Sequence, residues 1–160
     1  GETDGLVTDT PGILLGVQVA DCVPLLLHDP RHGVAGAIHC GWSPIVEGIV
    51  ERALALMEER FSTRPQDVEA VIGPSAGPCC YEVGPDVAGR LDSSSVHRVD
   101  GKLFADLKAE TNHRLTASGV RAVERIDDCT ICGESRYFSH RRDGVRAGRM
   151  MGFIVIKGKA

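Results

Sequence analysis

The sequence lacks the features that would place it in a membrane, on nucleic acid or in a multidomain array. No apolar run approaches the roughly 20 residues that span a bilayer, and the opening GETDGLVT has neither the basic nor the apolar region of a secretory signal. The net charge of -4 provides no general attraction for nucleic acid or an anionic membrane. Internal repeats, charge blocks and low-complexity linkers are also missing. We therefore expect a cytoplasmic protein whose partners include neither nucleic acid nor a membrane.

The length and composition favour one ordinary domain. A chain of 160 residues buries roughly two-thirds of its unfolded surface on folding, which is enough for a hydrophobic core. The contents of 42% hydrophobic and 25% charged residues are typical of globular proteins. Six cysteines in a cytoplasmic chain are more typical of reduced thiols, metal ligands or catalytic groups than of a disulfide framework. Residues 1–160 are thus expected to form a single domain.

The pattern of apolar residues predicts interleaved strands and helices. Short apolar runs bounded by turn residues predict strands at 13–19, 23–28, 34–39, 68–73, 121–126, 134–140 and 150–157. Helices are predicted from Ser43, where Ser43 is a candidate N-cap, and at 85–92 and 103–118. The stretch GPSAGPCCYEVG, residues 73–84, contains too many glycines and prolines for regular structure. Because the strands and helices do not follow a strict βαβ rhythm, the pattern favours a mixed sheet covered by helices over a pure parallel sheet, in a domain of the α+β or α/β class.

One predicted hairpin carries a cysteine and a histidine, Cys22 and His39, near the open ends of its strands. If the connecting loop occupies residues 29–32, the antiparallel register places these two residues directly opposite each other. A thiolate and an imidazole so placed can reach one metal ion at roughly 2.0 to 2.3 Å. Two other interpretations fit the same spacing: a Cys–His nucleophile pair, or ordinary packing, since cysteine is often buried.

The remaining motifs concern thiols, a carboxylate and a basic segment. Cys79-Cys80 and Cys129-x-x-Cys132 could form a four-thiolate zinc site or a redox pair. Glu82 follows the breaker-rich loop and could hydrogen-bond a polar substrate, or simply cap the next segment. Segment 139–149 is either an anion site or a solvated hairpin tip, because guanidinium groups bind phosphate in bidentate fashion. Its arginines are Arg141, Arg142, Arg146 and Arg149.

Taken together and in order, five motifs resemble the laccase-domain family, also called the multicopper polyphenol oxidase or purine nucleoside phosphorylase family. They are ADCVPLL, HCGW, GPSAGPCCYEVG, CTICGESRYFSHRRDG and GRMMGFIVIK, which cover nearly the whole chain. The resemblance implies a four-layer αββα sandwich. It also implies a metal, most often zinc, held by Cys22, His39 and a second histidine from an earlier segment. That segment is not in this sequence, so we expect the N-terminal part of the family domain to be absent.

The resemblance further implies phosphorolysis of adenosine, inosine, guanosine and methylthioadenosine, together with adenosine deaminase activity. A zinc site with an open position lowers the pKa of bound water and suits attack at C6 of adenine. Asp21 is the expected proton-transfer carboxylate, with Glu82 as the second candidate. Purine nucleoside and phosphate are the expected partners, and the matched Arg142 and Arg149 are the expected contacts of phosphate.

Two alternatives belong to other functional classes. A copper-dependent polyphenol oxidase needs several copper ions and more histidines than the six present, of which only His39 falls in the matched metal motif. One mononuclear site cannot store the four electrons of that reaction. A non-catalytic binding module, in which Cys22 and His39 hold a structural metal, is the other alternative.

Overall fold

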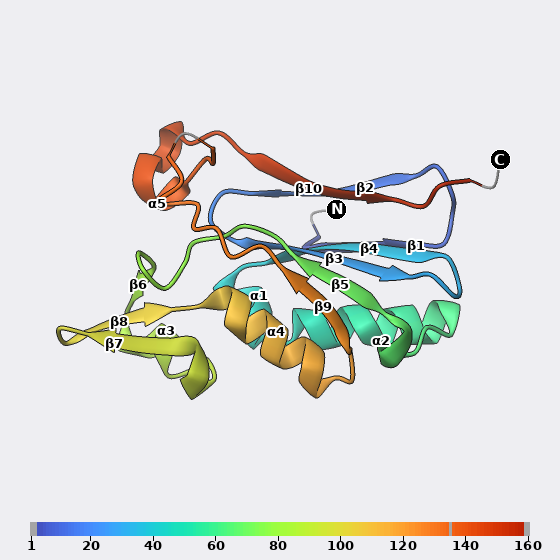
Figure 1. Cartoon of the computed structure of the whole chain (residues 1–160), viewed down its shortest axis with the longest axis horizontal. Helices are drawn as coiled ribbons and strands as arrows, with labels where there is room; N and C mark the ends of the chain where they lie inside the picture. Colours follow the sequence, from blue (N-terminus) through green and yellow to red (C-terminus); the bar gives the residue numbers. More distant parts are fainter. Residues whose placement is uncertain (1–2, 135, 159–160) are drawn as a thin grey trace.

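The computed structural model describes residues 3–134 and 136–158, which form stacked layers (Figure 1). A two-stranded sheet lies on one face of a five-stranded sheet, and helices cover the other face. Strands β5 and β9 pair in parallel and the other neighbours pair antiparallel, so the central sheet is mixed. In spatial order its strands are β1 (Gly5–Thr8), β4 (Val34–Cys40), β3 (Val23–Asp29), β5 (Glu69–Ile72) and β9 (Ala122–Arg125).

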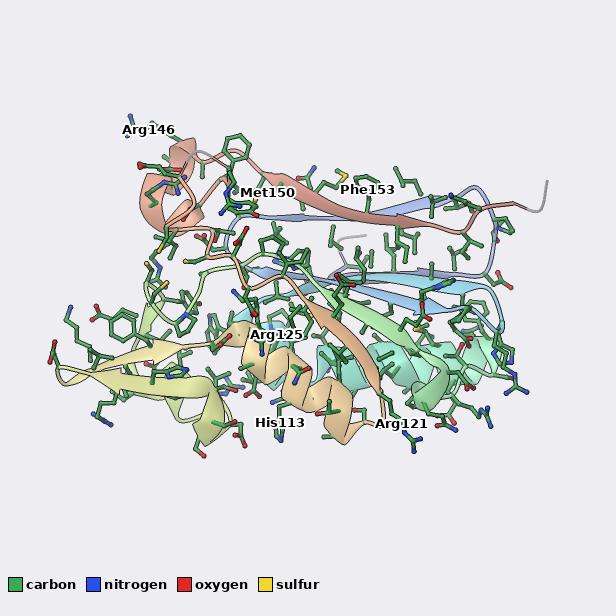
Figure 2. All side chains as sticks on the ribbon, in the orientation of Figure 1. His113, Arg121, Arg125, Arg146, Met150 and Phe153 are labelled. Atoms are coloured by element: carbon green, nitrogen blue, oxygen red, sulfur yellow. The ribbon has the colours of Figure 1, made fainter. Side chains whose placement is uncertain are left out.

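The two-stranded sheet consists of β2 (Leu14–Val19) and β10 (Met150–Val155). Its inner side packs Leu15 and Val17 against the alanines of β4. Its outer side is apolar and uncovered by the described residues: Phe153 is 60% exposed, and Figure 2 shows it on the side of β10 that faces away from the central sheet. The expected mixed α+β domain is confirmed, and the described residues supply three of the four layers that the resemblance implied.

The helical layer contains α1 (Trp42–Val46), α2 (Ile49–Phe61) and α4 (Leu107–Ala117). The main core lies between these helices and the central sheet and includes the fully buried Leu25, Ile38 and Met57. Two short helices are α3 (Pro85–Ala88) and α5 (His140–Asp143). Three 3-10 turns occupy Pro65–Asp67, Ser93–Ser95 and Gly144–Arg146. A small antiparallel sheet contains, in spatial order, β6 (Glu82–Val83), β8 (Lys102–Ala105) and β7 (Val96–Val99). None of the helices in the described part of the chain is long and apolar enough to cross a membrane.

The helix predicted from Ser43 is wrong in two respects. The N-cap is Gly41, and the Ser43 hydroxyl instead donates to the Glu47 carboxylate at 2.7 Å. The helix is also divided into α1 and α2, because Gly48 adopts a left-handed φ of 83° that an α-helix does not contain. The apolar stripe predicted across both pieces therefore packs on the sheet in two separate helices.

Three other predicted elements differ from the structure. The helix predicted at 103–118 begins only at Leu107, where the Asp106 carboxylate caps the Ala109 N–H, and the residues before it form β8. The helix predicted at 85–92 is limited to α3. The strand predicted at 134–140 is absent from its described residues, which form turns leading into α5, and residue 135 lies outside the described part. The other six predicted strands are present.

Candidate functional site

The register of the β3–β4 hairpin differs from the prediction. Pro24, not Cys22, lies opposite His39. The loop occupies residues 30–33, because Gly33 has a left-handed φ of 66° and its N–H donates to the Asp29 carbonyl at 2.9 Å. Asp29 therefore ends the strand, and the register shifts by two residues relative to the predicted one.

Cys22 and His39 nevertheless face the same side of the sheet. Cys22 precedes β3 by one residue and lies beside Gly41, where a β-carbon placed on the glycine would be 3.3 Å from the Cys22 sulfur. Gly41 is extended, with φ −77° and ψ 168°, so it faces the same way as His39, two residues before it. The two candidate ligands are thus diagonal neighbours rather than directly opposed, an arrangement that spans roughly 7 to 8 Å between strands.

His39 is held by Asp4, a residue that the sequence motifs did not single out. The His39 Nδ1 lies 3.5 Å from the Asp4 carboxylate, and the His39 backbone N–H donates to the Asp4 carbonyl at 2.7 Å. A carboxylate beside Nδ1 favours the tautomer with its proton there and leaves the Nε2 lone pair available. That Nε2 atom is buried and has no hydrogen-bond partner among the described residues. A buried, unpaired imidazole nitrogen of this kind fits a metal ligand.

The Cys22 thiol is not an activated nucleophile. Burial, together with the nearby Asp21 and Asp4 carboxylates, raises its pKa to about 11. The thiol is therefore protonated near neutral pH, which argues against the Cys–His nucleophile pair. A divalent cation would reverse this balance, because a coordinating thiol loses its proton to the metal.

Asp21, the predicted proton-transfer group, is buried and fully hydrogen-bonded. Its carboxylate accepts from the Thr130 hydroxyl at 2.6 Å, the Ser139 hydroxyl at 3.0 Å and the Arg141 backbone N–H at 2.6 Å. Its backbone carbonyl accepts from the Ala76 N–H at 2.9 Å. Asp21 thereby joins three separate segments to the start of β3. These contacts fix the position of the carboxylate, and its role in proton transfer stays a prediction.

Arg142 and Arg149, the predicted phosphate contacts, both already make hydrogen bonds within the protein. All five guanidinium N–H donors of Arg142 are used within the protein, two on the Asp143 carboxylate and three on backbone carbonyls. Arg142 therefore has no donor left for phosphate and instead fixes the preceding loop. Arg149 is exposed and donates to the carbonyls of Ala147 and Gly148.

A third arginine of this segment, Arg141, contacts Tyr81 and Glu82. Its guanidinium lies over the Tyr81 ring, 4.8 Å from the centroid, and donates to the Glu82 carbonyl at 3.0 Å. Burial raises the pKa of Tyr81, the Arg141 guanidinium opposes this rise, and Cys22 is near enough to add to it. The Glu82 carboxylate itself is paired with Lys102 at 2.8 Å. Glu82, Lys102 and Arg141 line an open hollow of about 470 Å³.

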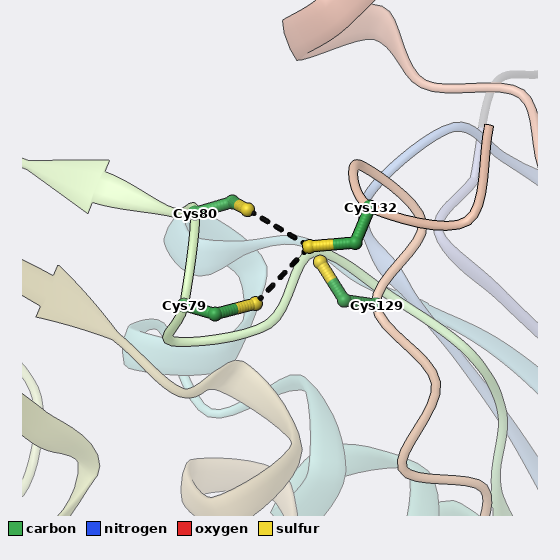
Figure 3. A group of neighbouring side chains, drawn as sticks. All are labelled: Cys79, Cys80, Cys129 and Cys132. Atoms are coloured by element: carbon green, nitrogen blue, oxygen red, sulfur yellow. Dashed lines mark hydrogen bonds between the residues drawn. The ribbon is translucent and has the colours of Figure 1, made fainter.

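A second group of potential ligands consists of the four cysteines Cys79, Cys80, Cys129 and Cys132 (Figure 3). Their sulfur atoms all lie within 4.8 Å of one another, and within the described residues this is the one group of three or more that could hold a metal ion. Burial raises the pKa of Cys129, but the backbone N–H groups of Cys132 and Gly77 outweigh it and lower that pKa to about 7. The pKa of Cys79 is raised to about 11 by burial and by the Cys132 thiol.

These observations define an α+β domain with two thiol-containing sites. The chain belongs to the family described as multi-copper polyphenol oxidoreductase laccase, whose sequence profile matches residues 1–157. It is 36% identical to the purine nucleoside phosphorylase CA_C1699 of Clostridium acetobutylicum, over 98% of this chain and 68% of that protein. It is 38% identical to the purine nucleoside phosphorylase YlmD of Geobacillus stearothermophilus, over 94% of this chain and 59% of that protein.

The fold agrees with these sequence relationships. The crystal structure of YlmD from Geobacillus stearothermophilus superposes with a TM-score of 0.92 and 35% sequence identity, covering 98% of this chain and 62% of that one. This chain thus spans roughly three-fifths of the YlmD protein. The family membership predicted from the five motifs is confirmed.

Proposed function

We propose that this chain is the catalytic part of a purine nucleoside phosphorylase. In this reaction an oxygen of phosphate forms a bond to C1′ of the ribose while the bond from C1′ to the purine nitrogen breaks. The products are ribose 1-phosphate and the free base. The observation that carries the proposal is the buried, unpaired His39 Nε2 on the same face as Cys22, in a chain whose relatives are named purine nucleoside phosphorylases.

Cys22 and His39 are the residues we assign to a zinc ion in this site. Bound zinc would supply Lewis acidity beside the substrate. Asp4 orients the His39 ring and fixes its tautomer through the contact at Nδ1. Because the chain contributes one cysteine and one histidine on this face, the remaining ligands come from elsewhere. Deamination of adenosine is the second reaction we propose for the same site, with inosine, guanosine and methylthioadenosine as further phosphorolysis substrates.

Arg141 replaces Arg142 and Arg149 in our assignment of the phosphate contact. Its guanidinium lies over the Tyr81 ring, and Cys22 is near enough to that ring to raise the pKa of the phenol. Asp21 fixes the backbone of Arg141, so this buried carboxylate acts as a positioning residue for the cation. Glu82 supports the same arginine through its backbone carbonyl, while its carboxylate is paired at the rim of the hollow.

Oxidase chemistry is less well supported than phosphorolysis. Within residues 3–134 and 136–158, the histidines do not gather into a group that could bind several copper ions, and the one candidate metal cluster consists of cysteines alone. The free thiols of the chain suit a reducing compartment, and we propose a cytoplasmic location for that reason.

Replacement of His39 tests the proposed function. Zinc-loaded protein is expected to release hypoxanthine from inosine only when phosphate is present. His39→Ala should bind less zinc and lose more than roughly 100-fold in kcat/KM, because the ligand itself is removed. His97→Ala, an exposed histidine on β7, is the matched control and should retain both. The proposal is wrong if zinc-loaded wild-type protein shows no phosphate-dependent release of base.

Replacement of Arg141 tests the phosphate contact. Arg141→Met keeps the backbone N–H that donates to Asp21 but removes the guanidinium. We expect the KM for phosphate to rise about 10-fold or more while the KM for inosine changes little. Initial rates measured across phosphate concentrations give both values. The exposed Arg121, near the helical layer in Figure 2, provides the control Arg121→Met. If both KM values changed equally, Arg141 would contribute to the folded structure of the site and not to phosphate binding in particular.

A further inference from the structure

The four-cysteine cluster has the dimensions of a tetrahedral zinc site. Zinc bonds thiolate sulfur at about 2.3 Å, which separates the sulfur atoms of a regular tetrahedron by about 3.8 Å. The Cys132 sulfur lies 3.1 Å from that of Cys80 and 3.5 Å from that of Cys79, and no pair in the cluster exceeds 4.8 Å. Small outward movements of the side chains would therefore place one ion among all four.

The Cys129-x-x-Cys132 segment is already shaped to present two thiolates. The Gly133 N–H donates to the Cys129 carbonyl at 2.9 Å, so the chain turns back on itself at these two cysteines. The Gly77 N–H, from the other loop, donates to the Cys129 sulfur at 3.2 Å. Such an amide donor stabilises negative charge on sulfur and fixes its direction, as outer hydrogen bonds do at metal sites.

Cys79 and Cys80 are adjacent, yet both can serve as ligands. They lie in a tight turn in which the N–H groups of Cys80 and Tyr81 both donate to the Gly77 carbonyl, at 3.0 and 2.9 Å. Figure 3 shows both side chains directed at Cys132, whereas in a strand adjacent side chains would point to opposite faces. A β-carbon at position 77 would lie only 3.1 Å from Cβ of Cys129 and 3.4 Å from the Cys79 sulfur, so glycine leaves this space open.

We propose that Cys79, Cys80, Cys129 and Cys132 bind one structural zinc ion. Four protein thiolates fill the tetrahedron and leave no position for substrate, which distinguishes this site from the one at Cys22 and His39. Binding releases the thiol protons to solvent and involves no change of oxidation state. The cluster is partly exposed, so an ion can enter without unfolding the domain. This proposal is independent of the proposed activity.

The zinc ion would tie two loops together beside the candidate catalytic groups. Tyr81 directly follows Cys80 and supports Arg141. Thr130 lies between the other two cysteines, and its hydroxyl donates to Asp21. Cross-linking the loops thus holds the ring under the arginine and the donor to the buried carboxylate in one fixed arrangement.

Metal substitution and thiol titration test this proposal. Protein purified under reducing conditions should contain zinc, and stepwise addition of a mercurial reagent should release one zinc ion as four thiols react. Protein reconstituted with cobalt should show the intense visible and near-ultraviolet bands of a tetrahedral cobalt–thiolate centre. Cys132→Ser should weaken the sulfur-to-cobalt charge-transfer band and lower zinc affinity at least 10-fold. Cys22→Ser, which alters the other site, should keep the tetrathiolate spectrum.

The outcomes separate the two sites. Loss of the cobalt–thiolate spectrum in Cys22→Ser but not in Cys132→Ser would overturn the proposal. So would a disulfide between Cys80 and Cys132 in protein that was kept reduced, or wild-type protein that releases no zinc when four thiols have reacted. This last measurement needs no variant, so it decides the question even if Cys132→Ser does not fold. Inactivity toward nucleosides would contradict the proposed function and leave this inference standing.

Discussion

Replacing Asp21 with alanine is expected to lower the free energy of unfolding by about 3 kcal/mol or more. The substitution removes a carboxylate that is 8% exposed and leaves three donors, from Thr130, Ser139 and Arg141, without their acceptor. Because these buried donors cannot form hydrogen bonds with water instead, the free-energy cost of their desolvation is no longer offset. Urea unfolding followed by circular dichroism measures the change.

Asp9→Ala is the matched control, because Asp9 is exposed and the substitution changes the same charge. It should alter the free energy of unfolding by less than about 0.5 kcal/mol. If the Asp21→Ala variant were as stable as the wild type but completely inactive, the result would support the proton-transfer role expected from the sequence. Loss of stability together with rearrangement near Arg141 would establish the positioning role.

Replacing Arg142 with methionine is expected to lower the melting temperature by roughly 5 to 10 °C. Methionine fills similar space but cannot donate to the carbonyls of Thr130, Ile131 and Tyr137, which all bind the guanidinium at 3.0 Å. Those carbonyls belong to the loop that carries Cys129 and Cys132, so the loop should also become more mobile. Differential scanning calorimetry measures the first effect, and amide hydrogen exchange measures the second.

Arg149→Met removes the same charge from the same segment and serves as the comparison. Arg149 is exposed and bonds only nearby carbonyls, so its melting temperature should stay within about 2 °C of the wild type. If Arg142→Met were as stable as Arg149→Met but bound phosphate more weakly, the guanidinium would be a ligand contact after all.

The strands were predictable where apolar residues form short runs between turn residues. β2, β3, β4, β5, β9 and β10 all lie within or close to their predicted ranges. Long-range pairing could not be predicted in the same way, because the parallel contact of β5 with β9 joins segments separated by α4 and the small sheet. Local pattern identifies such strands and leaves their order open.

Two errors arose from local backbone geometry. The helix predicted from Ser43 crosses Gly48, whose left-handed φ of 83° separates α1 from α2 without interrupting the apolar pattern. The β7–β8 hairpin was missed, although its Asp100-Gly101 turn, with φ of 48° and 79°, is the dipeptide that favours a tight hairpin. The Asp100-Gly101 signal is thus present in the sequence, but it conflicts with the helical spacing of the residues that follow it.

The site motifs were recognisable, but the roles of their residues depended on distant partners. Asp21 and Arg142 look reactive as isolated side chains, and only the folded chain shows that their hydrogen bonds are already used. The hairpin register depended on whether Gly33 belongs to the loop or the strand. Asp4 carried no motif, so its contact with His39 could come only from the pairing of β1 with β4.

The long sequence separations around Asp21 have a consequence for the order of folding. Thr130 is 109 positions away along the chain and Arg141 is 120 positions away, so this carboxylate finds its partners only after most of the chain has been synthesised. The β3–β4 hairpin and α2 depend on contacts between residues that are close in sequence, so they can form earlier as local units. On the ribosome, therefore, the strands of the central sheet emerge before the segment that carries Arg141, and the contacts of Asp21 with that segment form only afterwards.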